Sequence, residues 1–261
     1  MKNMGLEFNV NFIPIERNDM RWTINVNGTL QKTEITKLTN TPSEDYYGVQ
    51  VGSGMSSIGG YTSLYRVGYT PYTYYLYQQA YDENGSPLQN VFVDRNGDGT
   101  VNEQDKYVYK KAAPDVTIGF NTQLSWKALT LAVSAHANIG NYVYDNISSN
   151  GELLTDLWTN NFTNNRVVTA PQTNFRSAGQ YLSDYYVRNA SFLKLDNITL
   201  SYRFNLGNAS NRDLTLDVFG TVSNVATITG YKGIDPEIAG GIDNNMYPRP
   251  RTYILGVKFN F

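Results

Sequence analysis

The chain has 261 residues, of which 41% are hydrophobic, with no cysteine and a net charge of −2. This near-neutral charge gives no electrostatic basis for binding nucleic acid. The lack of cysteine excludes disulfides, thiolate catalysis and zinc–thiolate sites. A run of about 18 apolar residues, which a membrane helix needs, does not occur. Membrane-spanning β-strands remain compatible with this composition, because they alternate apolar and polar residues.

The N-terminal part of the chain predicts a hairpin followed by a long loop. Apolar and polar residues alternate over 6–12 and again over 22–26, which is the period of a half-exposed strand. We expect Pro14 to end the first strand and the charged residues 15–20 to form the turn. Residues 31–68 are polar and rich in glycine and serine, and they predict a long loop with one short strand.

Tyrosine is the dominant aromatic residue, at 21 positions against 11 phenylalanines and 3 tryptophans. A dense β-prone group occurs at 72–77 and contains Tyr72, Tyr74, Tyr75 and Tyr77. Tyrosine rings settle at a membrane–water interface or stack on ligands. We therefore predict that this segment is a strand whose rings form an interfacial belt or a ligand-stacking surface.

An acidic loop follows a short predicted strand at 91–93. Its oxygen-bearing side chains stand at positions 1, 3, 5, 7, 9 and 12 of a calcium-binding loop, with Gly99 at position 6. These six residues are Asp94, Asn96, Asp98, Thr100, Asn102 and Asp105. The sequence predicts a Ca²⁺ site here. The alternative is a turn whose side chains cap their own backbone.

The second half of the chain has the clearest strands. Residues 116–125 and 129–137 alternate on either side of a tight turn at 126–128, and 193–204 alternates with a slip across Asp196-Asn197 that predicts a β-bulge. Residues 214–222 also alternate, although Phe219 lies on the polar side. The last strand places one set of apolar residues on a single face: Tyr253, Leu255, Val257, Phe259 and Phe261.

The connections between these strands alternate in length. They are short at 126–128, long at 141–190, short at 205–212 and long at 227–251, and 153–158 predicts a short helix in the first long one. Outer-membrane barrels have short turns on the periplasmic side and long loops outside. The fold class predicted is therefore all-β: an antiparallel transmembrane β-barrel segment of about eight to ten strands with long extracellular loops, the acidic loop among them.

Four stretches resemble one family of transporters. They are Asp94–Gly99, Asn189–Tyr202, Gly230–Glu237 and Tyr247–Tyr253, and their order along the chain is that of SusC/RagA-type TonB-dependent transporters. The resemblance implies import of large nutrients, glycan oligosaccharides or peptides, across the outer membrane of Bacteroidetes-like bacteria. It implies a SusD-like surface lipoprotein and TonB as partners. It also implies that the terminal strand, ending at Phe261, is a signal for the barrel assembly machinery.

Full-length members of this family carry a signal peptide, a plug and a 22-stranded barrel. Nothing in residues 1–261 resembles the signal or the plug, so we expect a C-terminal portion of the barrel that contacts TonB only through other parts of the receptor. The polar side of the strands carries asparagine, threonine, serine and glutamine, which suit a wide lumen. This favours a segment of a large barrel over an independent small porin.

Two other classes of function make different demands on these residues. A soluble or cell-surface calcium-binding β-domain, with a carbohydrate-binding role, would bury six residues that a barrel turns to lipid: Leu131, Val133, Leu214, Leu216, Val257 and Phe259. An enzyme is not expected, because His136 is the only histidine and no nucleophile motif accompanies it. We expect His136 to be a hydrogen-bonding residue on the lumen side.

Overall fold

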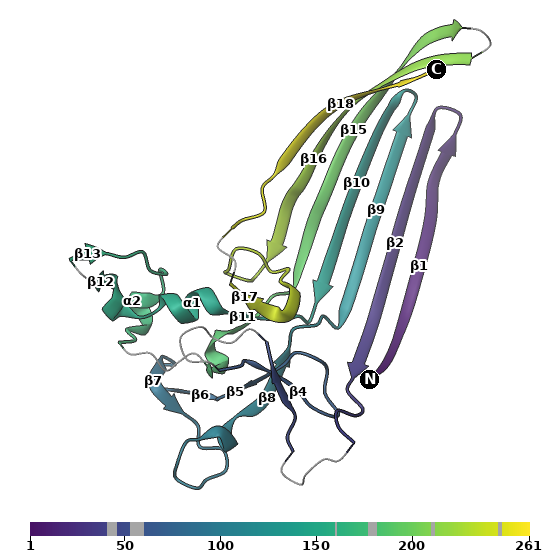
Figure 1. Cartoon of the computed structure of the whole chain (residues 1–261). Coiled ribbons are helices and arrows are strands. Elements are labelled where there is room, and N and C mark those ends of the chain that lie inside the picture. The colour runs from purple at the N-terminus through teal and green to yellow at the C-terminus, as the bar shows by residue number, and fades with distance from the viewer. Residues whose placement is uncertain (41–45, 53–59, 160, 177–181, 210–211, 245–246) are drawn as a thin grey trace.

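The computed structural model describes residues 1–40, 46–52, 60–159, 161–176, 182–209, 212–244 and 247–261. Seven long strands form one antiparallel sheet in the order β1-β2-β9-β10-β15-β16-β18 (Figure 1). Their bounds are Lys2–Arg17 (β1), Met20–Glu34 (β2), Val116–Trp126 (β9), Leu129–Ile139 (β10), Phe192–Ala209 (β15), Arg212–Thr229 (β16) and Thr252–Asn260 (β18).

The short connections of the long sheet lie at one end and the long connections at the other (Figure 1). The β9–β10 turn is the tight one predicted, with Lys127 in the left-handed region at φ 52°. The short connection predicted at 205–212 is narrower than expected, because β15 continues to Ala209 and β16 begins at Arg212. Residues 210–211 lie outside the described residues. The confirmed alternation of connection lengths puts all three long loops on the same side of the sheet.

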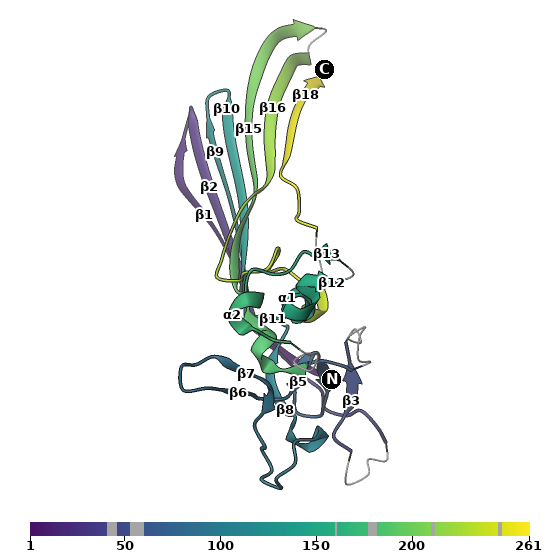
Figure 2. The same ribbon diagram turned by 90° about the vertical axis from the view of Figure 1, so that its left-hand side faces the viewer.

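The long connections fold into a separate layer of short elements at their end of the sheet, so the long strands stand as a single layer (Figure 2). No helix among the described residues is long and apolar enough to cross a membrane. The short strands are β3 (Val49–Val51), β4 (Ser63–Tyr65), β5 (Thr73–Leu76), β6 (Gln79–Tyr81), β7 (Pro87–Phe92), β8 (Tyr107–Lys111), β11 (Tyr142–Asp145), β12 (Trp158–Thr159), β13 (Phe162–Thr163), β14 (Val187–Asn189) and β17 (Ile242–Asp243). The α-helices are α1 (Asn146–Gly151) and α2 (Ala170–Thr173), and 3₁₀ turns span Glu103–Asp105, Leu154–Leu157, Asp184–Tyr186 and Ala239–Gly241.

The buried apolar core of the described residues lies in this loop layer. Its main cluster is formed by Tyr74, Leu76, Tyr144, Phe175, Tyr186 and Val187. The Tyr74 hydroxyl lies 2.9 Å from the carbonyl of Tyr142 and 2.6 Å from that of Gly241. These three residues come from the three different long connections, so the tyrosine joins all of the loops into one unit.

Two predictions about strand regularity have opposite outcomes. The β-bulge is confirmed, because Ser134 and Ala135 face Asn197 and Leu195, which leaves Asp196 as the extra residue. The prediction that Pro14 ends the first strand is wrong, since β1 continues to Arg17 through an irregularity between Phe12 and Ile15. A proline lacks an N–H group, and a β-bulge is a place where the sheet does not need one.

The tyrosine-rich segment is not a wall strand. It forms β5 in a small sheet with the order β3-β4-β5-β8. The described long sheet therefore has seven strands, against the eight to ten expected. Four residues are too few to cross a bilayer, where a tilted strand needs about nine to eleven. The predicted loop at 31–68 holds two short strands, β3 and β4, and the predicted helix at 153–158 is the 3₁₀ turn Leu154–Leu157.

The exceptional position of Phe219 has a steric explanation. Phe219 pairs with Gly256 of β18, and a Cβ atom added to Gly256 would lie 2.4 Å from the Phe219 ring. Phe8 and Gly28 form a second pair of this kind, also at 2.4 Å. In both pairs the ring lies over the glycine, which leaves space for an aromatic side chain on a crowded sheet surface.

Tyr74→Phe tests whether this tyrosine holds the loop layer together. The variant leaves the carbonyls of Tyr142 and Gly241 without their donor, and we expect a loss of about 1–3 kcal/mol in the stability of the layer. Faster amide hydrogen exchange at 239–243 in the full-length protein would report it. Tyr109→Phe, at an exposed ring of the same small sheet, is the control and should change stability by less than about 0.5 kcal/mol. Equal exchange in both variants would contradict this role for Tyr74.

Candidate functional site

One face of the long sheet is apolar and uncovered. Along β18, Tyr253, Leu255 and Val257 expose 71%, 83% and 70% of their surface, and Phe259 and Phe261 are also exposed. None of the six diagnostic residues is buried: Leu131, Val257 and Phe259 are exposed, and Val133, Leu214 and Leu216 are half-buried. A soluble domain would have buried all six under a second layer, and the described part of the chain provides no such layer.

The opposite face, called the polar face below, is a ladder of small hydrogen-bonding side chains. Asn25 donates to Asn9 across β1 and β2 at 2.7 Å, and Thr199 and Thr221 bond across β15 and β16 at 2.9 Å. Near the short turns, Arg203 of β15 forms an ion pair with Asp217 of β16 at 2.7 Å. This face has the wettable character of a wide lumen wall.

A group of charges fastens the connection between β16 and β18 to the polar face. Lys194 of β15 is 4% exposed, and its Nζ lies 2.7 Å from Glu237 Oε2 and 3.6 Å from Asp235 Oδ1. Arg249 closes the group, with Nε 2.6 Å from Asp235 Oδ2 and Nη1 2.9 Å from Glu237 Oε2. We call Lys194, Asp235, Glu237 and Arg249 the charged anchor.

The pKa of Glu237 reflects two opposing effects in the anchor, burial and the neighbouring positive charges. Burial acts to raise the pKa of Glu237, but the hydrogen bond from Lys194 and the charges of Lys194 and Arg249 outweigh burial, so the pKa lies below its ordinary value. A lowered carboxyl pKa stabilises the folded state at neutral pH, and this contribution is lost as the pH falls through the lowered value. The anchor is therefore fully formed at neutral pH.

His136 extends the anchor on the polar face. Its Nδ1 lies 2.7 Å from Asp196 Oδ2, the bulge residue, and its Nε2 lies 3.5 Å from Glu237 Oε1. Its ring packs edge-on against Phe192, with the centroids 5.3 Å apart. The nearby Ser134 hydroxyl accepts a hydrogen bond from Asn197 rather than facing the imidazole. This geometry fits the hydrogen-bonding role predicted for His136.

The structure separates the four candidate tyrosines. Tyr74 is fully buried, so its predicted role as an interface or ligand aromatic is wrong: its ring fills the core of the loop layer. Tyr72 is exposed and packs against Tyr65. Tyr75 stacks with Tyr47 at 6.0 Å. These rings form small aromatic pairs rather than one continuous row.

Tyr77 stands beside the acidic loop. Its ring stacks with Phe92 at 5.0 Å and lies 5.1 Å from the Lys106 ammonium. Burial, followed by the charge of Glu103, raises the pKa of Tyr77 to about 12. A ligand or interface role for Tyr72, Tyr75 and Tyr77 stays a prediction.

The acidic loop closes on its own backbone. Asp94 accepts hydrogen bonds from the N–H groups of Gly97 and Gly99 at 2.7 and 2.8 Å, and Asp98 accepts one from Thr100 at 2.8 Å. Gly97 and Gly99 have φ of 73° and 83°, which the sharp turn requires. The backbone-capping arrangement is thus present.

Asp105 is the last of the six predicted calcium ligands, and it is fully buried. Its carboxylate accepts N–H groups from Arg95, Asn96 and Asn102, and these hydrogen bonds, that of Asn102 foremost, lower its pKa. Within the described ranges, no group of three or more His, Cys, Asp or Glu side chains is placed to hold a metal. A calcium ion here would therefore need the amide and hydroxyl oxygens of Asn96, Asn102 and Thr100, and the site stays a prediction.

No protein-family model matches the chain. The chain is 42% identical over 267 residues to the TonB-dependent receptor SusC of Bacteroides thetaiotaomicron, a match that covers 100% of this chain and 26% of that receptor. It also resembles the RagAB peptide transporter in structure, with a TM-score of 0.74 and 21% identity over 99% of this chain and 29% of that one. The chain is a segment of a SusC/RagA-type TonB-dependent receptor.

Other relatives agree on the extent of this receptor segment. A TonB-dependent receptor of Formosa agariphila is 25% identical over 100% of the chain, which covers 29% of that receptor. The closed state of the RagAB peptide importer gives a TM-score of 0.70 at 22% identity, again with 99% of this chain and 29% of that one covered. The segment thus spans between a quarter and three tenths of the receptors it matches. Kinship with this family assigns it to the outer membrane.

Three of the four family-like stretches of the receptor segment meet in space at the charged anchor and at His136 beside it. Lys194 and Asp196 belong to the stretch 189–202, Asp235 and Glu237 to 230–237, and Arg249 to 247–253. The sequence indicated the stretches but not the anchor, because the ion pairs of Lys194 join residues more than 40 positions apart and leave no periodic signal. The one available signal in the sequence was the presence of charged residues within otherwise apolar or turn-forming segments.

Lys194→Met tests the charged anchor. Removing the ammonium group leaves Asp235 paired with Arg249, and Glu237 paired with Arg249 and His136. Breaking such a buried pair costs about 3–5 kcal/mol. We expect residues 230–244 of the full-length receptor to lose protection in amide hydrogen exchange. The matched control is Lys232→Met, an exposed lysine of the same connection. If Lys194→Met left the exchange of this segment unchanged, the anchor would not be what positions it.

Proposed function

We propose that this chain supplies part of the wall and extracellular face of an outer-membrane receptor that imports large nutrients, glycan oligosaccharides or peptides, in a TonB-dependent manner. The observation that carries the proposal is the single-layer sheet with one bare apolar face and one polar face, on which a folded loop layer is anchored. Relatives named TonB-dependent receptors and a peptide transporter support it. The relatives are receptors and transporters rather than enzymes, and we propose no catalytic role.

The proposal requires the sheet to continue beyond this chain. Among the described residues, β1 and β18 each pair on one side only. Unpaired N–H and C=O groups in hydrocarbon cost several kcal/mol each, roughly, so a spanning sheet has to close. We propose that further strands of the receptor pair with both outer strands, in a barrel of the 22-stranded type.

The partners follow from the orientation of the segment. The loop layer lies at the extracellular end, where a SusD-like surface lipoprotein would dock, and TonB would act through parts of the receptor outside this chain. The terminal strand exposes Tyr253, Leu255, Val257, Phe259 and Phe261. We propose that this row of side chains is what the outer-membrane assembly machinery recognises.

Placing an arginine on each face in turn tests the lipid-facing wall. Val133→Arg puts a charge on the apolar face at the middle of β10, and we expect a cost of about 2–4 kcal/mol and a lower amount of full-length receptor in the outer membrane. Ser134→Arg, one residue further on the polar face, is the matched control and should assemble normally. The measurements are the heat-modifiable band of the outer-membrane fraction and TonB-dependent uptake of labelled oligosaccharide or peptide. Equal assembly of both variants, or uptake that persists without the receptor or TonB, would contradict the proposal.

We also propose that the acidic loop binds Ca²⁺ and that the ion makes it rigid. Extracellular calcium modules bind at roughly 10⁻⁴–10⁻³ M, so millimolar Ca²⁺ should slow amide exchange at 95–104 in the full-length receptor, and a chelator should reverse this effect. Asp98→Asn should weaken binding about tenfold, whereas Asp82→Asn, in a separate exposed turn, should leave it unchanged. Exchange that is insensitive to Ca²⁺ would mean that backbone capping alone shapes the loop.

A further inference from the structure

Two lysines stand at one end of the apolar face of the long sheet. Lys2 of β1 and Lys32 of β2 lie at the end nearest the loop layer, beside the N-terminus (Figure 1). In the register, Leu6 pairs with Leu30 and Met4 pairs with Lys32, and Lys2 comes two residues before Met4. Alternate residues of a strand share a face, so both lysines continue the apolar row to which Leu6 and Leu30 belong. This row therefore ends in two positive charges.

The length of the apolar row fixes the level of these lysines. On β2 the row runs through alternate residues from Met20 to Leu30, which is about 34 Å along a strand. A barrel strand tilted by about 40° covers about 26 Å of membrane thickness over that length, and the apolar band of such barrels is about 25 Å tall. Lys32 is the next residue on this face, so its ammonium group falls at the level of the lipid headgroups. In such a barrel the long loops mark this level as the outer one.

Both ammonium groups are free to bind an anion. Lys2 and Lys32 are exposed, and neither forms an ion pair with another residue of the described ranges. They are diagonal neighbours across β1 and β2, with Cα atoms about 7–8 Å apart, so both side chains can reach one phosphate group. Glu34 faces Lys2 in the register and is half-buried, which leaves one positive charge in excess.

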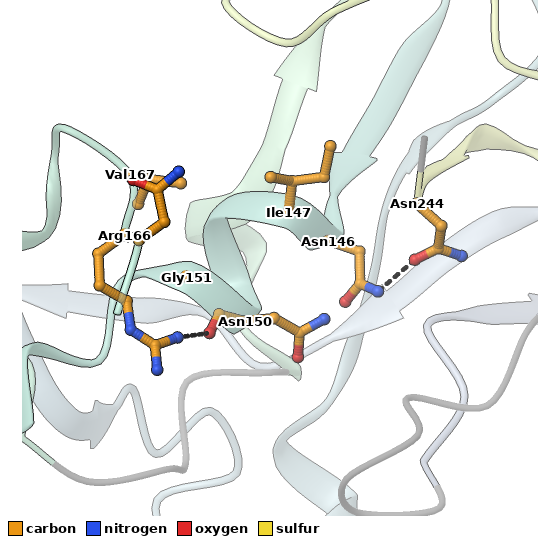
Figure 3. A pocket seen from close by; sticks show the side chains of 8 residues that line it. Asn146, Ile147, Asn150, Gly151, Arg166, Val167 and Asn244 are labelled. Atoms are coloured by element: carbon orange, nitrogen blue, oxygen red, sulfur yellow. Dashed lines mark hydrogen bonds between the residues drawn. The ribbon is translucent and has the colours of Figure 1, made fainter. Parts of the chain in front are cut away.

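A cation of the loop layer shows the contrast. Arg166 lines a pocket of about 490 Å³ beside α1, where its Nη1 donates to the Asn150 carbonyl at 3.4 Å (Figure 3). Its Nη2 also lies 3.2 Å from Asp156 Oδ2. The charge of Arg166 is thus compensated within the chain, whereas Lys2 and Lys32 can gain a partner only from outside the described residues.

We propose that Lys2 and Lys32 bind the phosphate of an anionic lipid in the outer leaflet, whose acyl chains lie along Met4, Leu6 and Leu30. These three apolar side chains are 48%, 65% and 44% exposed and continue directly from the lysines. A soluble anion or an acidic protein segment would match the charges but not the bare apolar row beside them. The inference rests on the proposed function, because it needs the apolar face to lie in the membrane, and it adds a ligand at the outer rim of that face.

The test is native mass spectrometry of the full-length receptor in detergent, titrated with lipid A that carries one phosphate and with the same lipid A after removal of the phosphate. We expect the phosphorylated lipid to bind about tenfold more tightly, because each lysine near an anionic headgroup contributes about fivefold and Glu34 offsets part of this gain. The double variant Lys2→Gln/Lys32→Gln should lose the preference. Lys232→Gln/Lys258→Gln, at two exposed lysines away from the apolar face, is the matched control and should keep it.

Glu34→Gln separates the effect of charge from a structural one. Removing the carboxylate beside Lys2 leaves both lysines unopposed, so the phosphorylated lipid should bind about fivefold more tightly than it binds the wild type. A disturbance of β2 would weaken lipid binding instead. The heat-modifiable band verifies that each variant is folded.

Three outcomes would overturn the inference: equal affinity for the two lipids, a phosphate preference that persists in Lys2→Gln/Lys32→Gln, or displacement of the lipid by an equal concentration of inorganic phosphate. Assembly and uptake are measured in parallel. A receptor that assembles in the outer membrane and imports its nutrient, but does not distinguish the two lipids, refutes the lipid site alone. A receptor that is absent from the outer membrane or lacks TonB-dependent uptake refutes the proposed function itself.

Discussion

The constraint on which the rest of the structure depends is backbone hydrogen bonding in a single-layer sheet. Each inner strand of the described sheet satisfies its N–H and C=O groups on both neighbours, so the sheet needs no second layer to be saturated. This frees one face to be bare and apolar, as at Leu255 and Val257, and the other to be polar. The strict alternation of side chains follows, because a one-residue slip would exchange the two faces. The bulge at Asp196 is tolerated because β16 carries its own irregularity opposite it.

The buried hydrophobic core lies in the long connections and not on the sheet. In a soluble protein the strands would supply the core, but here the buried rings of Tyr74, Tyr144 and Tyr186 lie in the long connections. These rings bury apolar surface, and their hydroxyl groups form hydrogen bonds with carbonyl or carboxylate oxygens of the loops. Phenylalanine would bury the same surface but could not form these hydrogen bonds, which explains the preference for tyrosine. The charged anchor then joins this layer to the sheet through Lys194. Apolar packing holds the loops to each other, and ion pairs hold them to the wall.

This arrangement fits the proposed import of hydrophilic nutrients. The polar face carries few uncompensated charges, because Arg203 pairs with Asp217 and Lys194 with Glu237. Ligands crossing such surfaces exchange hydrogen bonds with amides and hydroxyls, each worth little net energy, and are not held by strong ionic contacts. The acidic loop, with its fully buried Asp105, forms a separate element of the layer whose side chains cap their own backbone.

The sequence by itself determined the wall: strand positions in the second half, the bulge at Asp196, the alternation of short and long connections, and the bare apolar row of β18. These features depend on period-two alternation and local turn chemistry, which neighbours in sequence encode. Tertiary structure alone decided that Tyr74 is core and not surface, that β1 runs past Pro14, and that Lys194 meets Asp235, Glu237 and Arg249. It also decided that Asn146 meets Asn244, 98 residues away. Contacts of that range depend on how three loops pack together, and no local pattern records them.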